Sequence, residues 1–163
     1  MRKEPKLPGN KLQRLPKKNM KYVHCGHKQF LKQNFKKVKN YGWVKPEGGL
    51  WASSTEAEFG WKQWCKGQEF RECPEDNAFY FTLAAGAKVV HIRSLEDLKE
   101  LPEDDTAKFK MSDMICPDFE KMRDSGIDAI ELHLSEDYRL YWALYGWDCD
   151  SILIMNPDIV MEC

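Results

Sequence analysis

Short runs of apolar residues, several with strict alternation, recur along the chain and predict a protein rich in β-strands. Between residues 78 and 83, the large side chains of Phe79, Phe81 and Leu83 alternate with Ala, Tyr and Thr. The last of these runs precedes an Asn-Pro pair, which bounds a buried strand. Strands are expected at residues 21–24, 50–53, 78–83, 89–93, 127–134, 138–145 and 151–155.

Four helices are expected between these strands. Leu31, Phe35 and Val38 follow the i, i+4, i+7 spacing of one helical face, which predicts a helix from residue 27 to about residue 40. The other three are expected from a cap at Ser54 or Thr55 to residue 66, from a capping box of Ser94 with Asp97 to residue 101, and over residues 117–125. This order of elements predicts an α+β fold rather than a doubly wound α/β sheet.

The length of 163 residues is that of one domain. Residues 1–20 hold three of the eight prolines and many lysines, and are expected to form an extended basic arm before a single domain over residues 21–163. No run approaches the ~18 apolar residues of a membrane span, and no apolar block follows the basic start. A cytoplasmic protein without membrane contact is the simplest interpretation.

The near-neutral net charge of −1 conceals an uneven distribution along the chain. Residues 1–39 carry thirteen lysines or arginines and one acid, and residues 40–163 carry twelve bases and 25 acids. Clustered bases favour contact with nucleic acid, because they displace counterions from phosphates. The alternatives are a solvated tail and a tail that folds back on its own acidic domain.

The segment from His24 to His27 brings two histidines and one cysteine close together, which raises the question of a metal site. Adjacent residues cannot all reach one tetrahedral ion, and no second pair of ligands with suitable spacing follows. The six cysteines form no CxxC pair either. We therefore expect no metal.

Residues 21–65 contain the chemically informative pattern. A predicted strand ends at His24 and is followed by Gly26, where the backbone can approach a ligand closely. About 25 residues further along the chain, a Gly-Gly turn leads into a predicted strand that carries Trp51. If the two strands lie side by side, an imidazole, glycine amides and an indole line one cleft, which suits a flat heteroaromatic amide with a ribose attached.

This stretch resembles the first half of the ADP-ribosyltransferase fold, in the branch shared by poly(ADP-ribose) polymerases and diphtheria-toxin-like enzymes. In that branch a strand ends in His-Gly, an Asn-Phe pair follows, and a Gly-Ile-Tyr strand leads into a helix with a second aromatic residue. The C-terminal run from residue 148 to residue 156 resembles the family's last strand, which begins with a catalytic acid. The matching positions are His24-Cys25-Gly26, Asn34-Phe35, Gly42-Trp43, Gly49-Leu50-Trp51-Ala52-Ser53, and Trp61 or Trp64.

The resemblance implies two small packed β-sheets with peripheral helices, residues 23–26 beside residues 49–53, and NAD bound as substrate in the cleft. His24 would orient a ribose hydroxyl, and the backbone of Gly26 would hold the nicotinamide carboxamide. Trp51, with Trp61 or Trp64, would sandwich the nicotinamide ring. The other residues expected at the NAD site are Cys25, Gly49, Ala52 and Ser53.

The family's catalytic glutamate has no counterpart at the start of the last strand. By simple register Ser151 falls there, with Asp148 and Asp150 beside it. Because a carboxylate in this place supports an oxocarbenium-like transition state, these three residues are the catalytic candidates together with His24 and Trp51. We favour Asp148, since the preceding Gly-Trp bend can aim its side chain into the cleft.

Each candidate also has a purely structural interpretation. His24 and Trp51 can be core residues, and Trp61 and Trp64, three positions apart on one helical face, can pack in the core. The two aspartates can simply be polar residues at the entry to a strand.

These patterns together predict a mono-ADP-ribosyltransferase that uses NAD to modify a protein or nucleic-acid acceptor. The basic arm favours nucleic acid, and the small size suggests a toxin, a phage effector or a defence enzyme. Two alternatives remain: an NAD glycohydrolase, with water as acceptor, and a non-catalytic module of the same fold that binds ADP-ribose or nucleic acid.

Overall fold

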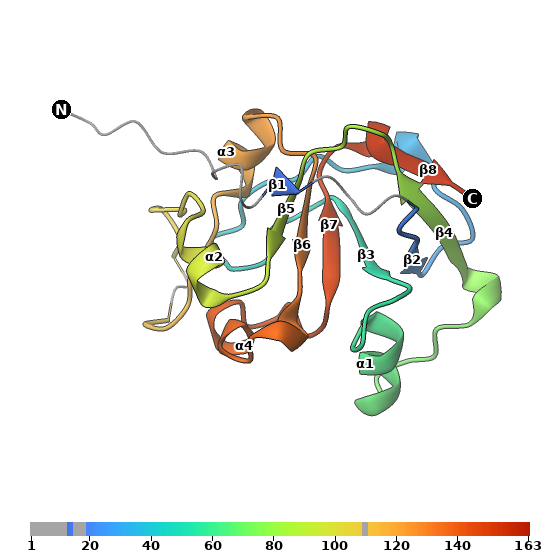
Figure 1. The fold of residues 1–163 in the computed structure, drawn as a ribbon, viewed down its shortest axis with the longest axis horizontal. Helices are drawn as coiled ribbons and strands as arrows, with labels where there is room; N and C mark the ends of the chain where they lie inside the picture. Colours follow the sequence, from blue (N-terminus) through green and yellow to red (C-terminus); the bar gives the residue numbers. More distant parts are fainter. Residues whose placement is uncertain (1–12, 15–18, 109–110) are drawn as a thin grey trace.

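A computed structural model describes residues 13–14, 19–108 and 111–163, in which eight strands form one sheet in the order β1-β5-β6-β7-β3-β2-β4-β8 (Figure 1). The strands are β1 (Gln13–Arg14), β2 (Tyr22–Cys25), β3 (Leu50–Ser54), β4 (Ala78–Leu83), β5 (Val89–Ile92), β6 (Ala129–Leu132), β7 (Ser151–Ile154) and β8 (Val160–Glu162). The helices are α1 (Trp61–Gly67), α2 (Leu95–Lys99), α3 (Phe119–Asp124) and α4 (Arg139–Ala143). The predicted α+β class is confirmed.

The sheet curves so that β2 and β4 face β5, β6 and β7 across an apolar core. Tyr22 and Phe81 from one side of this core pack with Val89 and Ile152 from the other. The expected pair of separate sheets is wrong, because β3 pairs with β2 along one edge and with β7 along the other. This shared strand joins the two halves into a single sheet.

Helices α2, α3 and α4 cover the opposite face of β5, β6 and β7. Figure 1 shows these helices on the side of the sheet where β5 lies, away from β4 and β8. Neighbouring residues on one strand enter different cores: Ile152 and Ile154 face β2 and β4, whereas Leu153 packs beneath the helices. Strands buried on both faces require continuous apolar runs, and the run at residues 152–155 provides one.

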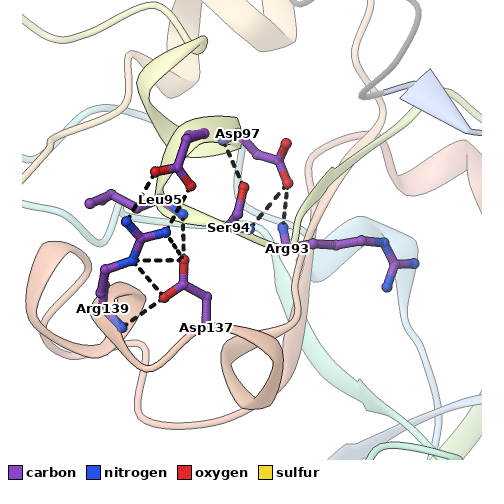
Figure 2. Close-up of polar contacts among 7 residues, drawn as sticks. Arg93, Ser94, Leu95, Asp97, Asp137 and Arg139 are labelled. Atoms are coloured by element: carbon purple, nitrogen blue, oxygen red, sulfur yellow. Dashed lines mark hydrogen bonds and ion pairs between the residues drawn. The ribbon is translucent and has the colours of Figure 1, made fainter.

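Hydrogen bonds at the start of α2 hold this helix to the loop before α4 (Figure 2). Ser94 Oγ accepts the backbone N–H of Asp97 at 3.2 Å, and Asp97 Oδ2 accepts that of Ser94 at 3.1 Å, so the predicted capping box is confirmed. Asp137 Oδ2 accepts the N–H of Leu95 at 2.9 Å and contacts the Arg139 guanidinium at 2.7 Å. The hydrogen bonds from Arg139 lower the pKa of Asp137 well below its usual range.

The helix expected over residues 27–40 is wrong, because the structure has one 3-10 turn there, Lys32–Asn34, within an extended loop. Phe35 packs against the core between the sheet halves, whereas Val38 packs in the core beneath the helices. The backbone of the loop bonds to the following segment, with Gly49 N–H donating to the Lys36 carbonyl at 2.8 Å. The apolar residues in this segment therefore pack into two different cores and do not form one face of a helix.

The strand expected over residues 138–145 is also wrong, because this segment forms α4. Leu140, Ala143 and Leu144 are buried while Tyr141 and Trp142 are exposed, which is helical spacing. Helix α1 begins later than expected: its N-cap is Gly60, not Ser54 or Thr55.

Most of the predicted basic arm, residues 1–12 and 15–18, lies outside the described residues. Gln13 and Arg14 pair with Val90 and Val89 as the edge strand β1. Among the described residues, every helix is too short or too polar to cross a membrane.

Candidate ligand-binding cleft

The antiparallel pairing of β2 with β3 ends after Val23, which lies opposite Ser53. Beyond this point β2 continues beside β4 to Cys25, whereas β3 runs beside β7 to Leu50. The two strands therefore diverge, and a cavity of about 220 Å³ opens along the split. The predicted proximity of residues 23–26 and 49–53 is confirmed at this point.

Three tryptophans line this cavity, which we call the indole cavity: Trp51 from β3, Trp61 from α1, and Trp147 from the segment before β7. The Trp51 and Trp147 rings meet edge to face, with centroids 4.8 Å apart at 78°. The predicted site residues that line the cavity are His24, Cys25, Trp51, Ala52, Ser53, Trp61, Asp148 and Ser151.

The His24 side chain crosses the split between the strands. Its Nδ1 lies 2.7 Å from the Trp51 carbonyl oxygen, and a carbonyl can only accept, so Nδ1 carries the proton. Its Nε2 then accepts from Nδ1 of His27 at 3.0 Å. Burial lowers the pKa of His24 and outweighs the hydrogen bond to the Trp51 carbonyl, which acts in the opposite direction. His24 is therefore neutral near pH 7, and His27 occupies its Nε2 lone pair.

Ser53 connects three parts of the indole cavity. Its buried hydroxyl donates to the Asp150 carbonyl at 2.8 Å and accepts the Trp61 backbone N–H at 2.9 Å. The hydroxyl thereby fixes the first residue of α1 against β3 and the start of β7. Trp64 stacks on Trp61 with centroids 5.0 Å apart, but it lies behind Trp61 and does not line the cavity.

Asp148 lies in a tight turn at the edge of the cavity. The Cys149 N–H donates to the Trp147 carbonyl, so the turn contains three residues, and the φ of Asp148 is 27°. Positive φ is strained for an aspartate, and such strain concentrates at functional sites. The Ser151 hydroxyl also lines the cavity, while donating to the Cys149 carbonyl at 3.1 Å.

The structure does not place Asp150 with the other candidates. Its carboxylate accepts two hydrogen bonds from Ser135, from the backbone N–H and from Oγ, both at 2.9 Å. It lines a different cavity on the opposite face of β3. In extended backbone, residues two apart share a face, but Asp148 and Asp150 line different cavities, because the turn at Asp148 interrupts the extended backbone.

Two predicted glycines have structural roles that limit their part in binding. The Gly26 N–H is already hydrogen bonded to the Asn77 carbonyl at 2.8 Å. At Gly49, with φ of 74°, a Cβ would lie 2.5 Å from Leu153 Cδ1, so close packing requires glycine there. Gly49 lines a second cavity rather than the first.

This second cavity, also of about 220 Å³, adjoins the first. Phe30, Phe35 and Phe79 line it, and we call it the phenylalanine groove. His24 and Trp51 belong to both cavities and form the boundary between them. Two similar spaces with aromatic walls therefore meet at one histidine and one tryptophan.

Sequence reasoning missed two cations of the indole cavity, Lys45 and Arg71. The Lys45 Nζ lies 4.8 Å from the centroid of the Trp51 ring and donates to the Gly146 carbonyl at 3.2 Å. Arg71 lies over the Trp61 ring at 5.5 Å and donates to the Cys25 carbonyl at 3.3 Å. Neither cation carries a sequence signal, because tertiary folding alone brings these loops to the cleft.

The thiols of the indole cavity are unsuited to act as nucleophiles. Burial, followed by the influence of Cys73, raises the pKa of Cys25 to about 12. Burial likewise raises the pKa of Cys149 to about 12. Both thiols therefore stay protonated near neutral pH, which disfavours covalent cysteine catalysis at this site.

Comparisons of the chain with protein-family models, with curated proteins and with solved structures found no match.

Proposed function

We propose that this protein is an NAD-dependent ADP-ribosyltransferase. The observation that carries the proposal is the pair of adjoining cavities that share His24 and Trp51. A dinucleotide has two ring systems joined through riboses and a pyrophosphate, so it suits two aromatic spaces with polar groups at their boundary. Each space, at about 220 Å³, is below the usual range for a whole ligand and fits one end of such a molecule.

In this proposal nicotinamide enters the indole cavity, where Trp51 and Trp61 provide aromatic surfaces. The adenosine end lies in the phenylalanine groove. His24, which is neutral and lines both cavities, accepts a hydrogen bond at Nε2 from a ribose hydroxyl that displaces His27. The cations Lys45 and Arg71 provide the charge that favours a pyrophosphate.

The reaction breaks the bond between the nicotinamide nitrogen and ribose C1′, and the electron pair leaves with nicotinamide. The acceptor nucleophile forms the new bond to C1′ and releases its proton to solvent. Asp148 is the carboxylate of the indole cavity, and its negative charge favours the positive charge that develops on the ribose. Ser151 provides a hydroxyl rather than the missing glutamate at the start of β7.

For the acceptor, the proposal favours a nucleic acid or a protein bound to one. Thirteen of the 25 basic residues lie in the first 39 positions. Among the described residues of this segment, six lysines are exposed to solvent: Lys21, Lys28, Lys32, Lys36, Lys37 and Lys39. Clustered exposed bases attract phosphate backbones.

The test is to incubate the full chain with NAD labelled in its adenylate phosphate, and with DNA, RNA or a cell lysate. Nicotinamide release and label transfer are measured together. We expect both, and we expect Asp148→Asn to lower both by about 10²-fold or more, which is typical for the loss of one preorganised electrostatic contact. The matched control is Asp158→Asn, an exposed aspartate that pairs with Lys32 outside both cavities.

The alternatives give different results in the same assay. Release without transfer indicates an NAD glycohydrolase. Binding of NAD or ADP-ribose without release indicates a non-catalytic module. Failure of NAD to bind at all contradicts the proposal, since the two cavities are its basis.

A further inference from the structure

A cluster of two histidines and a glutamate lies in a third cavity, on the face of β3 opposite the indole cavity. His91 on β5 is the strand partner of Glu131 on β6, and His133 follows two residues after Glu131, directly after the end of β6. The ligand atoms of the three side chains all lie within 4.8 Å of one another. None of the three residues belongs to the cleft described above.

Two of the spacings within the cluster, both measured from His91, match those of ligands that share a metal ion. Nδ1 of His91 lies 3.0 Å from Nε2 of His133 and 3.4 Å from Oε2 of Glu131. Two ligands at about 2.0–2.1 Å from one ion, at tetrahedral or right angles, stand roughly 2.9–3.4 Å apart. A small shift of these side chains would therefore admit an ion without a change of the backbone.

The backbone beneath the cluster is rigid and buried. β5 and β6 lie inside the sheet, and their parallel pairing continues beyond β6, with the His133 N–H donating to the Ile92 carbonyl at 2.9 Å. The Glu131 side chain is 9% exposed and that of His91 is 11% exposed. Rigid strands place ligands more precisely than loops do.

Polar groups around the cluster would orient the ligands. The Tyr22 hydroxyl donates to Glu131 Oε2 at 3.0 Å. Glu136 Oε1 lies 3.8 Å from Nδ1 of His133, on the ring nitrogen that does not face His91. A carboxylate beside the second nitrogen of a ligating histidine is a recurrent feature of metal sites, because it fixes the tautomer and strengthens the donor.

The cavity at the cluster, of about 460 Å³, attracts cations. Besides Glu131 and Glu136 it is lined by Glu56, Glu58 and Asp150, against one arginine, Arg93. We call it the acidic cavity. It gives an ion a route to the cluster, and it leaves room for water at the remaining coordination positions.

We propose that His91, Glu131 and His133 bind one divalent transition-metal ion, with water completing its coordination in the acidic cavity. Two imidazoles favour zinc, cobalt or iron(II) over magnesium or calcium, which prefer oxygen ligands. Three protein ligands with an open position are the pattern of reactive rather than closed structural zinc sites. The proposal is independent of the ADP-ribosyltransferase proposal, because the two sites lie on opposite faces of β3.

The probes are Co²⁺, followed by its visible absorption bands, and Zn²⁺, followed by equilibrium dialysis, both with the full chain. We expect one ion per chain and no thiolate charge-transfer band, since no cysteine is among the described residues that line the acidic cavity. His133→Gln and Glu131→Gln should weaken binding by at least about 100-fold, and Tyr22→Phe, which removes a group behind a ligand, by about 10-fold.

His27→Gln is the matched control, because His27 and His24 form a second stacked histidine pair, also at 3.0 Å. This control should bind Co²⁺ like the unaltered chain. The thermal midpoint of each metal-free variant shows whether it folds. If the variant Glu131→Gln, altered at a buried position, does not fold, His133→Gln alone tests the proposal. Absence of Co²⁺ and Zn²⁺ binding by the unaltered chain, or binding lost in His27→Gln and kept in His133→Gln, overturns the proposal.

Discussion

Nδ1 of His24 donates across the split between β2 and β3 to the Trp51 carbonyl, 2.7 Å away. A side chain here replaces the ladder hydrogen bonds that the diverging strands can no longer make. The same bond fixes the tautomer and makes Nε2 an acceptor, which bonds to His27 in the structure and to the ribose in the proposed complex. One residue thus closes the sheet and presents the polar atom on which the proposed NAD site depends.

His24→Asn separates these two roles. An asparagine amide can donate to the Trp51 carbonyl in place of Nδ1, but it places no acceptor where Nε2 lies. We expect nicotinamide release to fall by about 10²-fold or more, with little change in thermal midpoint. His24→Ala should additionally lower stability, by about 1–3 kcal/mol, because the carbonyl is left without its donor. Equal losses of stability and activity in His24→Asn would contradict the proposed role.

Stability should decrease at mildly acidic pH because of His24. Its pKa is lowered by burial, so below the unfolded-state value of about 6.5 the unfolded chain binds a proton that the folded chain does not. The stabilising effect of neutral His24 is complete above that pH and is lost as the pH falls toward the lowered folded-state pKa. Urea unfolding at pH 7.5 and 5.5 measures the difference, which should be smaller in His24→Asn than in the unaltered chain.

Asp148→Gly should stabilise the protein and inactivate it. The positive φ of 27° costs an aspartate on the order of 1 kcal/mol that glycine does not incur, although glycine also makes the unfolded chain more flexible. We expect an equal or higher thermal midpoint together with loss of nicotinamide release. A marked drop in midpoint would show that the Asp148 side chain has a structural role.

Ser94→Ala tests the capping box at the start of α2. Loss of the hydroxyl that accepts the Asp97 N–H should destabilise the protein by about 1 kcal/mol. For a chain of this size, this corresponds to a thermal midpoint lower by roughly 2–4 °C. Ser112→Ala, at an exposed position outside the helices, is the control and should not change the midpoint.

Removal of residues 1–12 tests the basic arm while leaving β1 in place. The deletion takes away four bases and one acid. If these bases contact phosphates, affinity for nucleic acid should fall, and the slope of log K against log salt should decrease by up to about 3. NAD binding should be unaffected. An unchanged salt slope would mean that the arm does not contact nucleic acid.

Local patterns in the sequence were enough to locate most strands. β4 was readable from the alternation of Phe79 and Phe81, and β7 from an apolar run that is buried on both faces. The capping box of Ser94 and Asp97 was readable for the same reason, since its hydrogen bonds join residues three apart. The grouping of His24 with Trp51 also followed from their positions at the ends of paired strands.

Long-range contacts decided what the sequence could not show. Phe35 and Val38 carry helical spacing, yet they pack in different cores, and only the closed sheet determines which residue enters which core. Asp148 lines the indole cavity and Asp150 lines the acidic cavity, because the positive φ of Asp148 turns the chain between the two residues.

The three residues of the proposed metal site show the same limit. His91 and Glu131 are 40 positions apart, and no spacing rule relates them. They lie together because β5 and β6 pair in parallel. This pairing is stabilised by the helices that pack on one face of the two strands and by the apolar core on the other face. The sequence determined where most of the strands form, because burial of alternate residues is a local pattern. The tertiary fold decided which strands become neighbours and therefore which side chains meet, and it added the short edge strands β1 and β8, which no local pattern had indicated.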